Sequence, residues 1–272
     1  MSLIRLVGSV DTEHKKKESA ACRDVLGFYQ KNVSPDPPLG RKRVFVQPAP
    51  DGIPRACVDG LPGRYIINLN CLNTLRYCQL VYQLGHELGH VWCDPSPGKS
   101  SWFVESVCAA MARLALTYMG KRWRKHPTVY KGRGYAKEFL KYHDDGIRKS
   151  ANEVGLEQEG DVQGWVQEEL PCIIQRGEIG ADDLGRKYQL LCAVLIERSF
   201  TAHARSWGAI CKLGVATRNE RTDFAKWKQL VAAHESPLVE QLSICFAGPA
   251  KAEQGHPRDR PGAFPAESGI GT

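Results

Sequence analysis

The stretch 73–92 constrains the fold most, because its side chains separate into rows that only an α-helix brings together. Apolar residues recur at 4-3-4-3 spacing, the pattern of a helix face that packs on a core. This apolar row consists of Tyr77, Val81, Leu84, Leu88 and Val91. The polar row beside it consists of Gln79, Gln83, His86 and His90. The pattern predicts an amphipathic helix whose polar row lines a cleft.

Two glycines form a third row on this predicted helix. Gly85 and Gly89 lie one turn apart. Each costs about 1 kcal/mol relative to alanine in a helix interior. Two such losses in one helix indicate that a neighbouring helix or strand packs closely against this row.

The polar row contains a metal-binding signature. His86-Glu87-Leu88-Gly89-His90 has the form HExxH, which is typical of zinc-binding helices. On a helix, His86 and His90 lie one turn apart on one face, so both imidazoles can reach one ion. Glu87 is rotated by about 100° and is better placed to hold a water at that ion than to coordinate it. We predict one Zn²⁺ bound by the two histidines, with Glu87 as the catalytic base. The alternative is a surface helix with two ordinary histidines.

A catalytic zinc usually takes three protein ligands, and Glu105 is the best candidate for the third. It lies among apolar residues on a second helix, predicted over 101–119, where an unpaired carboxylate is costly. Ala109 and Ala112 continue its face and leave room for the first helix to approach. A glutamate near a helix start is also favoured by the helix dipole without any metal.

Two other residues remain alternatives for the third ligand. Asp94 lies one turn beyond His90, although capping or a contact behind the ligands suits it equally well. His126 could arrive from the segment that follows the second helix, although Pro127 and its polar setting indicate a loop.

The rest of the sequence predicts an α+β fold. β-type runs at 3–7 and 44–47 flank a helical pattern at 18–32, and a turn over 59–63 predicts a hairpin that ends in a strand at 65–69. Beyond residue 130 the signals are almost entirely helical. Those helices are predicted over 136–149, 162–175, 183–199, 202–213 and 222–235. We therefore divide the chain into a lobe with the zinc-site helices (1–120), a helical lobe (121–247) and a disordered tail (248–272).

Composition excludes some classes of protein. Apolar stretches are broken before the roughly 20 residues that a bilayer requires, so no membrane segment is expected. The first residues lack the basic region and cleavage site of an export signal. The ten cysteines, none of them spaced Cys-x-x-Cys, are therefore expected to be reduced thiols, and we predict a cytoplasmic protein.

The net charge of +7 comes from one segment. Residues 121–149 contain ten Lys/Arg against three Asp/Glu, a balance of +7 that equals the charge of the whole chain. Five aromatic residues are interleaved with these cations, which is compatible with binding to nucleic acid or to an acidic protein. Such a segment is more often a solvated helix face whose aromatic side chains point to the core.

The HExxH motif and its surroundings resemble the zincin metallopeptidases, in particular the gluzincin group of thermolysin-like enzymes, in which a glutamate follows on the next helix. The resemblance covers roughly residues 42–118 and includes an edge-type strand, 65–69, of the kind zincins use to align an extended peptide. It implies that His86, His90 and Glu105 hold zinc and that Glu87 is the general base. It also implies a small mixed sheet and hydrolysis of peptide bonds in an intracellular protein.

Two other functions remain open. The chain could be a nucleic-acid-associated regulator that uses the basic segment 121–149. It could also be a catalytically silent zincin-like scaffold. Retention of HExxH with a plausible third ligand disfavours the scaffold.

Overall fold

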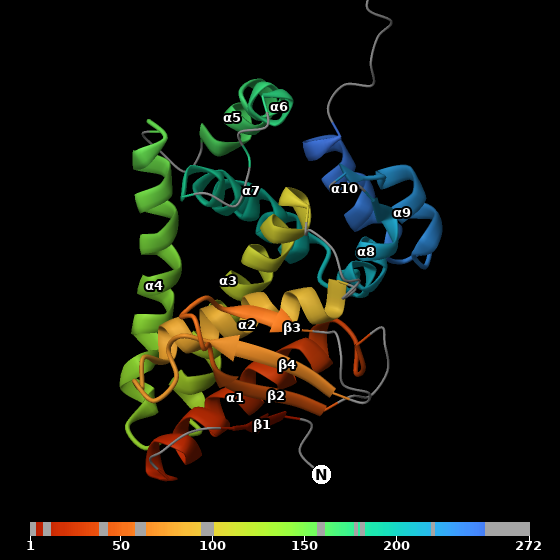
Figure 1. Cartoon of the computed structure of the whole chain (residues 1–272). Coiled ribbons are helices and arrows are strands. Elements are labelled where there is room, and N and C mark those ends of the chain that lie inside the picture. The colour runs from red at the N-terminus through yellow and green to blue at the C-terminus, as the bar shows by residue number, and fades with distance from the viewer. Residues whose placement is uncertain are drawn as a thin grey trace, which may run out of the picture.

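The structure is a computed structural model, and it describes residues 4–7, 12–37, 43–57, 64–93, 101–156, 161–176, 179, 183–218 and 221–247. Within these residues a small sheet and the helices beside it form one half of the molecule, and further helices form the other half (Figure 1). The predicted α+β class is confirmed.

Four strands form the sheet, in the order β1-β2-β4-β3. β1 (Ile4–Leu6), β2 (Arg43–Pro48) and β4 (Arg64–Leu69) are parallel, and β3 (Arg55–Cys57) pairs antiparallel with β4. Parallel neighbours need a crossover connection, which α1 (Thr12–Asn32) supplies between β1 and β2. The predicted strands, the mixed sheet and the hairpin are confirmed.

The strand at 65–69 is not an edge strand, so that prediction was wrong. Ile67 is paired with Val46 of β2 on one side and with Ala56 of β3 on the other. The hairpin is the physical reason, because its first strand covers the side of β4 that would otherwise be open. The edge of the sheet beyond β4 is therefore β3.

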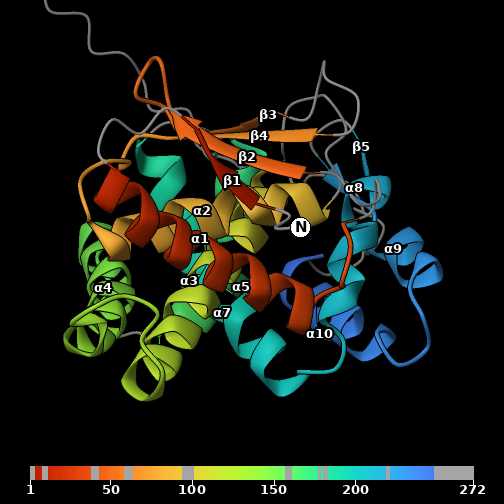
Figure 2. The same cartoon turned by 90° about the horizontal axis from the view of Figure 1, so that it is seen from below.

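In the part of the chain that the structure describes, helices cover one face of the sheet and leave the other open (Figure 2). α1 and α2 (Tyr77–Cys93) lie against this face. Strand residues that point towards the helices, such as Val46 and Ile67, are fully buried. Their neighbours Phe45 and Ile66 point to the opposite face and are partly exposed, as the alternation of a strand requires.

The motif helix α2 begins at Tyr77, later than the sequence predicted. Asn73 and Leu75 have φ angles of 65° and 53°, which a right-handed helix does not allow. Their backbone N–H groups instead donate to the buried carboxylate of Glu18 on α1, at 3.1 and 3.3 Å. A side chain from another helix therefore sets this boundary.

The helical half is organised around α3 (Trp102–Lys125), which contacts both α4 (Gly132–Glu153) and α7 (Asp183–Ala202). The helix predicted over 162–175 is in fact two helices, α5 (Val162–Glu168) and α6 (Leu170–Gln175). Pro171 explains the break, because proline fits the first turn of a new helix but not a helix interior.

The C-terminal region differs most from the sequence prediction. The stretch 202–213 contains a 3₁₀ helix, η2 (Trp207–Lys212), followed by α8 (Leu213–Ala216). A short hairpin of β5 (Thr217–Arg218) and β6 (Arg221–Thr222) comes next.

The helix predicted over 222–235 is shorter, because Asp223 caps α9 (Phe224–Leu230) by accepting from the N–H of Lys226. A further helix, α10 (Ser236–Phe246), was not predicted and has a proline in its first turn.

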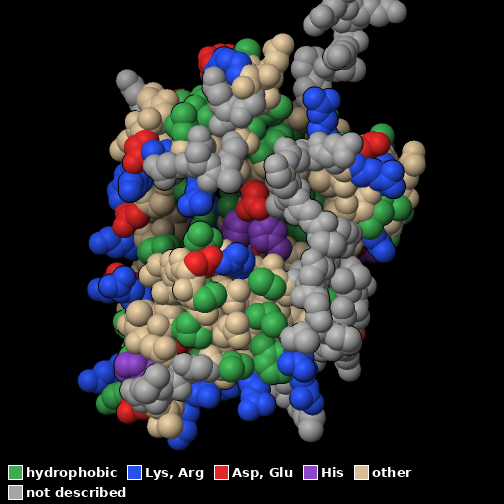
Figure 3. Space-filling model, in the orientation of Figure 1, with side chains coloured by type: hydrophobic (Ala, Val, Ile, Leu, Met, Phe, Trp, Pro, Cys, Tyr) green, Lys and Arg blue, Asp and Glu red, His purple; other side chains and the backbone are tan. Residues whose placement is uncertain are grey.

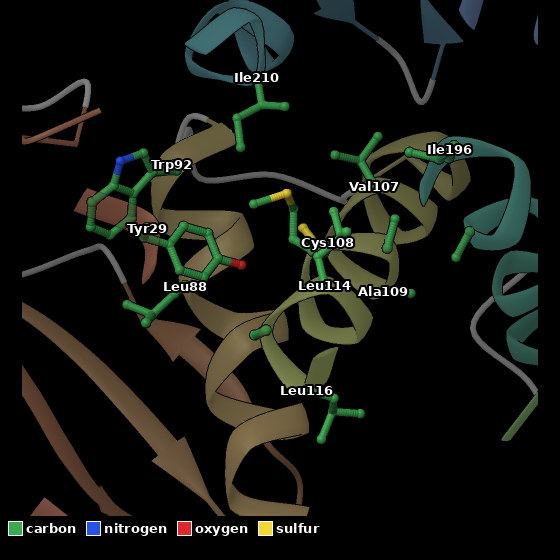
Figure 4. Packing of buried hydrophobic residues seen from close by; sticks show 14 of the residues in the cluster. Tyr29, Leu88, Trp92, Val107, Cys108, Ala109, Leu114, Leu116, Ile196 and Ile210 are labelled. Atoms are coloured by element: carbon green, nitrogen blue, oxygen red, sulfur yellow. The ribbon is translucent and has the colours of Figure 1, made fainter. Parts of the chain in front are cut away.

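The core is densest where α2 and α3 pack together (Figure 4). Figure 4 shows Leu88 and Trp92 of α2 and Tyr29 of α1 on the side of α3 that carries Cys108, with Val107 on the opposite side of α3. All five side chains are buried. The apolar row predicted for the motif helix therefore faces the core.

Three further predictions concern the chain as a whole. All ten cysteines are free thiols, as expected. Among the described residues no helix combines the length and the apolar character needed to cross a membrane. The division into lobes after residue 120 stays a prediction, and α3 runs through that position. The tail 248–272 lies outside the described residues.

Candidate metal centre

The geometry of the candidate centre depends on how closely α2 and α3 approach each other. A Cβ atom at Gly85 would lie 3.0 Å from Cα of Ala112, and one at Gly89 would lie 3.0 Å from both Cα and Sγ of Cys108. These contacts are too short for any residue larger than glycine without a shift of the helices. The expected close neighbour of the two glycines is confirmed and is α3. We call these four residues the glycine seam.

The seam brings Glu105, one turn before Cys108, to the polar row of α2. Nε2 of His86 lies 3.0 Å from Oε2 of Glu105, and Nε2 of His90 lies 3.5 Å from its Oε1. The two Nε2 atoms are 3.2 Å apart. The structure thus brings together the three residues predicted as ligands. Within the described part of the chain, they are the one group of His, Cys, Asp or Glu side chains arranged to hold a metal ion.

The three side chains are neither sealed in the core nor fully solvated. The exposed fractions are 21% for each histidine side chain and 26% for Glu105. In Figure 3 histidine side chains appear at the middle of one face, with acidic side chains close by. An ion held there could keep one coordination position for water or a substrate.

The donor set and its spacing fit a zinc ion. Zinc–ligand distances near 2.1 Å and tetrahedral angles place ligand atoms about 3.4 Å apart. The two Nε2 atoms are 3.2 Å apart, and each lies close to a different oxygen of Glu105, at 3.0 Å from Oε2 and 3.5 Å from Oε1, which is near that value. Two imidazoles and one carboxylate also form a ligand set used by catalytic zinc sites.

The charges within this group stabilise one another. Burial disfavours the charged form of Glu105, but hydrogen bonds from His86 and His90 outweigh it and hold the pKa of Glu105 well below its usual range. Burial also disfavours a protonated His90. The hydrogen bond and charge of Glu105, together with the charge of Glu87, overcome this and raise the pKa of His90 to about 9. Metal binding would therefore displace a proton from the group.

Glu87 lies next to the group and is 5% exposed. Its carboxylate makes no hydrogen bond or ion pair with any described residue, and its oxygen atoms are not sealed from solvent. Its charge nevertheless acts on His90. A carboxylate this buried that no described residue pairs with is uncommon, so Glu87 is a candidate for a role beyond the packing of α2.

The other residues of the polar row are engaged elsewhere. Gln79 and Gln83 both donate to Oδ1 of Asn70, and Gln83 accepts from the N–H of Asn70 at 3.2 Å. They hold the chain after β4 against α2. The structure does not join them to the metal-binding group.

The structure tests only one of the two alternative third ligands, Asp94 and His126. Asp94 lies outside the described residues. His126 caps the C-terminal end of α3. It follows Glu105 by 21 residues, or about 30 Å along a helix axis, and the structure does not bring it to this group.

The sequence analysis overlooked Tyr82, which lies one turn before His86 on α2. Burial raises the pKa of Tyr82 to about 12; the charge of Arg113 opposes this shift, and Tyr142 and Glu105 add to it. Its hydroxyl is therefore a protonated donor close enough to sense the charge of Glu105. The spacing of four residues from His86 was the available signal, because it places both side chains on one side of the helix.

The aromatic residues of the basic segment 121–149 divide between core and surface. Trp123 and Phe139 are buried, as expected for core-facing aromatics. Tyr130 is 82% exposed. Binding of nucleic acid by this segment stays a prediction.

Comparison with known proteins does not place the chain in a family: no family model matches it, and neither a curated protein nor a solved structure is similar to it.

Proposed function

We propose that this protein is a zinc-dependent hydrolase of peptide bonds, with zinc held by His86, His90 and Glu105. One observation carries the proposal. One ligand atom each from His86, His90 and Glu105, on two helices, lie within 4.8 Å of one another. The carboxylate of Glu87, which no described residue pairs with, lies beside them. The resemblance of the motif to the zincins supports the same assignment.

The chain supplies a base where hydrolysis needs one. When bound, zinc polarises a carbonyl group and lowers the pKa of water. Glu87 acts as the general base: its carboxylate accepts a proton from the attacking water and returns it to the leaving amine. The carboxylate is available for this proton because no described residue hydrogen-bonds to it.

The edge strand β3 is the element best suited to align an extended peptide. It packs against α2, and its outer side is not paired with any strand in the described ranges. An added peptide strand could form main-chain hydrogen bonds along that side. β3 therefore takes the role that the zincin resemblance gave to residues 65–69.

Substitution of Glu87 tests the proposal, because Glu87→Gln keeps the size of the side chain but removes its basicity. A peptide library is first screened for a substrate, and zinc is measured by elemental analysis. We expect Glu87→Gln to keep about one zinc per chain and to lose at least about 100-fold in hydrolysis. Glu168→Gln, an exposed substitution on α5, is the matched control and should behave as wild type.

Other results would support other functions. Hydrolysis by Glu87→Gln at the wild-type rate would contradict the mechanism. Loss of zinc from this variant would make Glu87 a ligand or a structural support. A wild-type protein that binds zinc and cleaves no peptide would be a silent scaffold. Salt-dependent binding of nucleic acid through segment 121–149 would instead favour the regulator.

A further inference from the structure

A hollow of about 350 Å³ lies on the face of the sheet that helices leave open. Its volume is within the range of small-ligand sites. Its lining combines three cations, an apolar floor and one amide group. These residues are Arg5, Lys15, Arg64, Phe45, Ile66 and Gln47, and Leu6 and Val7 complete the lining.

Strand register assembles this lining. Arg5 of β1 is paired with Phe45 of β2, which is paired with Ile66 of β4, so the three side chains form one row across the sheet. The Arg64 guanidinium carbon lies 5.5 Å from the centre of the Phe45 ring. Lys15 reaches the hollow from the first turns of α1. Three strands and a helix therefore contribute to one site.

Among the described residues the hollow is cationic without a counter-charge. No described acidic side chain lines it, and Arg5, Lys15 and Arg64 form no ion pair with a described residue. By contrast, Arg55 on the same sheet is paired with Asp51. Like charges gathered on one sheet face repel each other, and a bound anion would remove that cost.

The other groups that line the hollow indicate a ligand larger than an inorganic anion. Phe45 and Ile66 are half-buried and offer an apolar surface. Gln47 donates to Oδ1 of Asn68 at 3.1 Å, which leaves its carbonyl oxygen as an acceptor for a ligand N–H or O–H. Arginine binds phosphate through paired donors and stacks on planar rings.

We propose that this hollow binds an organic phosphate with a planar body, the chemistry of a nucleoside monophosphate. Arg5, Lys15 and Arg64 hold the phosphate, and the planar group packs on Phe45 and Ile66. The same phosphate and base occur in single-stranded nucleic acid. The hollow and α2 lie on opposite faces of the sheet, so this site does not depend on the proposed zinc chemistry.

Calorimetric titration of the full chain with adenosine monophosphate at low salt tests the proposal. We expect wild-type binding in the micromolar to millimolar range, and a loss of at least about tenfold in Arg5→Gln/Arg64→Gln and in Lys15→Gln. Arg55→Gln, on the same sheet but outside the hollow, should bind within about twofold of wild type. His86→Ala should also bind normally, which separates this site from the metal centre.

Matched probes identify the source of the phosphate. Adenosine without phosphate should bind at least about tenfold more weakly than the monophosphate. A short oligoadenylate that binds tighter than the monophosphate, and loses that advantage in Arg5→Gln/Arg64→Gln, would assign the site to a nucleic-acid strand. Equal binding of adenosine and its monophosphate, unchanged binding in both hollow variants, or no binding at millimolar concentrations would overturn the proposal.

Discussion

Two clusters of histidine and glutamate lie along α3 and differ in one residue type. The first joins His86 and His90 to Glu105. The second joins His143 of α4 to Glu197 of α7, with Nε2 to Oε1 at 2.9 Å. In the second cluster Arg113 of α3 donates to Oε2 of Glu197 and to the carbonyl oxygen of His143, at 2.8 and 2.9 Å.

The Arg113 guanidinium is the main difference between the two clusters. Arg113 supplies a permanent positive charge and fills the space between its partners, and its side chain is 3% exposed. The His86/His90/Glu105 group is paired with no arginine or lysine among the described residues, is more exposed, and has the carboxylate of Glu87 beside it. The same two residue types therefore build a closed structural network in one place and the proposed site for a divalent cation in the other.

The strongest way to break the comparison is to remove one histidine from each cluster. His86→Ala should weaken zinc binding by more than about 1,000-fold, because it removes a ligand. Loss of a residue that only hydrogen-bonds to a ligand typically costs about 10–100-fold. His143→Ala should leave zinc affinity unchanged. Competition with a chelator measures both. Equal zinc loss in the two variants would show that the clusters are not distinct.

Arg113→Met tests the structural network. We expect the free energy of unfolding to fall by about 3 kcal/mol, because Glu197 loses its main partner while buried. This loss is at the low end of the roughly 3–5 kcal/mol expected for breaking a buried ion pair, because His143 still pairs with Glu197. Arg124→Met, an exposed change on the same helix, should be neutral within about 0.5 kcal/mol in urea unfolding. A neutral Arg113→Met would remove the structural role.

Gly89→Ala tests whether the seam positions the metal-binding group. The added methyl group would meet Cα of Cys108 at 3.0 Å and push the helices apart. We expect a loss of about 2 kcal/mol in stability together with weaker zinc binding. Gly134→Ala, in α4 with nothing near its Cβ position, is the control and should not reduce zinc affinity. Unchanged zinc affinity in Gly89→Ala would separate packing from metal binding.

The smallest effect concerns pH. Burial and Arg113 oppose a protonated His143, but Glu197 and Asp144 outweigh them and raise the pKa of His143. A raised pKa stabilises the fold below the ordinary histidine pKa, and this contribution is lost as pH rises through the folded-state value. We therefore compare the free energy of unfolding of wild type with that of His143→Gln at two pH values. The advantage of wild type should be larger at about pH 5.5 than at about pH 9, by about 1 kcal/mol or less. The opposite sign would contradict the assigned charge state.

Local periodicity explains what the sequence could predict. The rows of α2, the close contact at Gly85 and Gly89, and the grouping of Glu105 with two histidines follow from spacing within two consecutive helices. The hairpin of β3 and β4 follows from its turn residues. These features depend on neighbours close in the sequence.

Features that depend on residues far apart in the sequence could not be predicted from it. The start of α2 is set by Glu18, which lies more than 50 residues before Asn73. The network of Arg113 and His143 spans 30 residues, and its link to Glu197 spans 54, with no motif to mark either. The order of strands, which makes β3 the edge, likewise depends on pairings that sequence patterns do not specify.

The glycine seam also bears on how such a protein could change over generations. Replacement of Glu87 alone would remove the proposed base yet leave the helices in place, so the proposed activity could be lost while the fold persisted. Replacement of Gly89 would disturb shape and chemistry together. Among descendants of this chain, small residues at the crossing of α2 and α3 should therefore be retained even where the proposed activity is lost. They would mark the position of the former metal site.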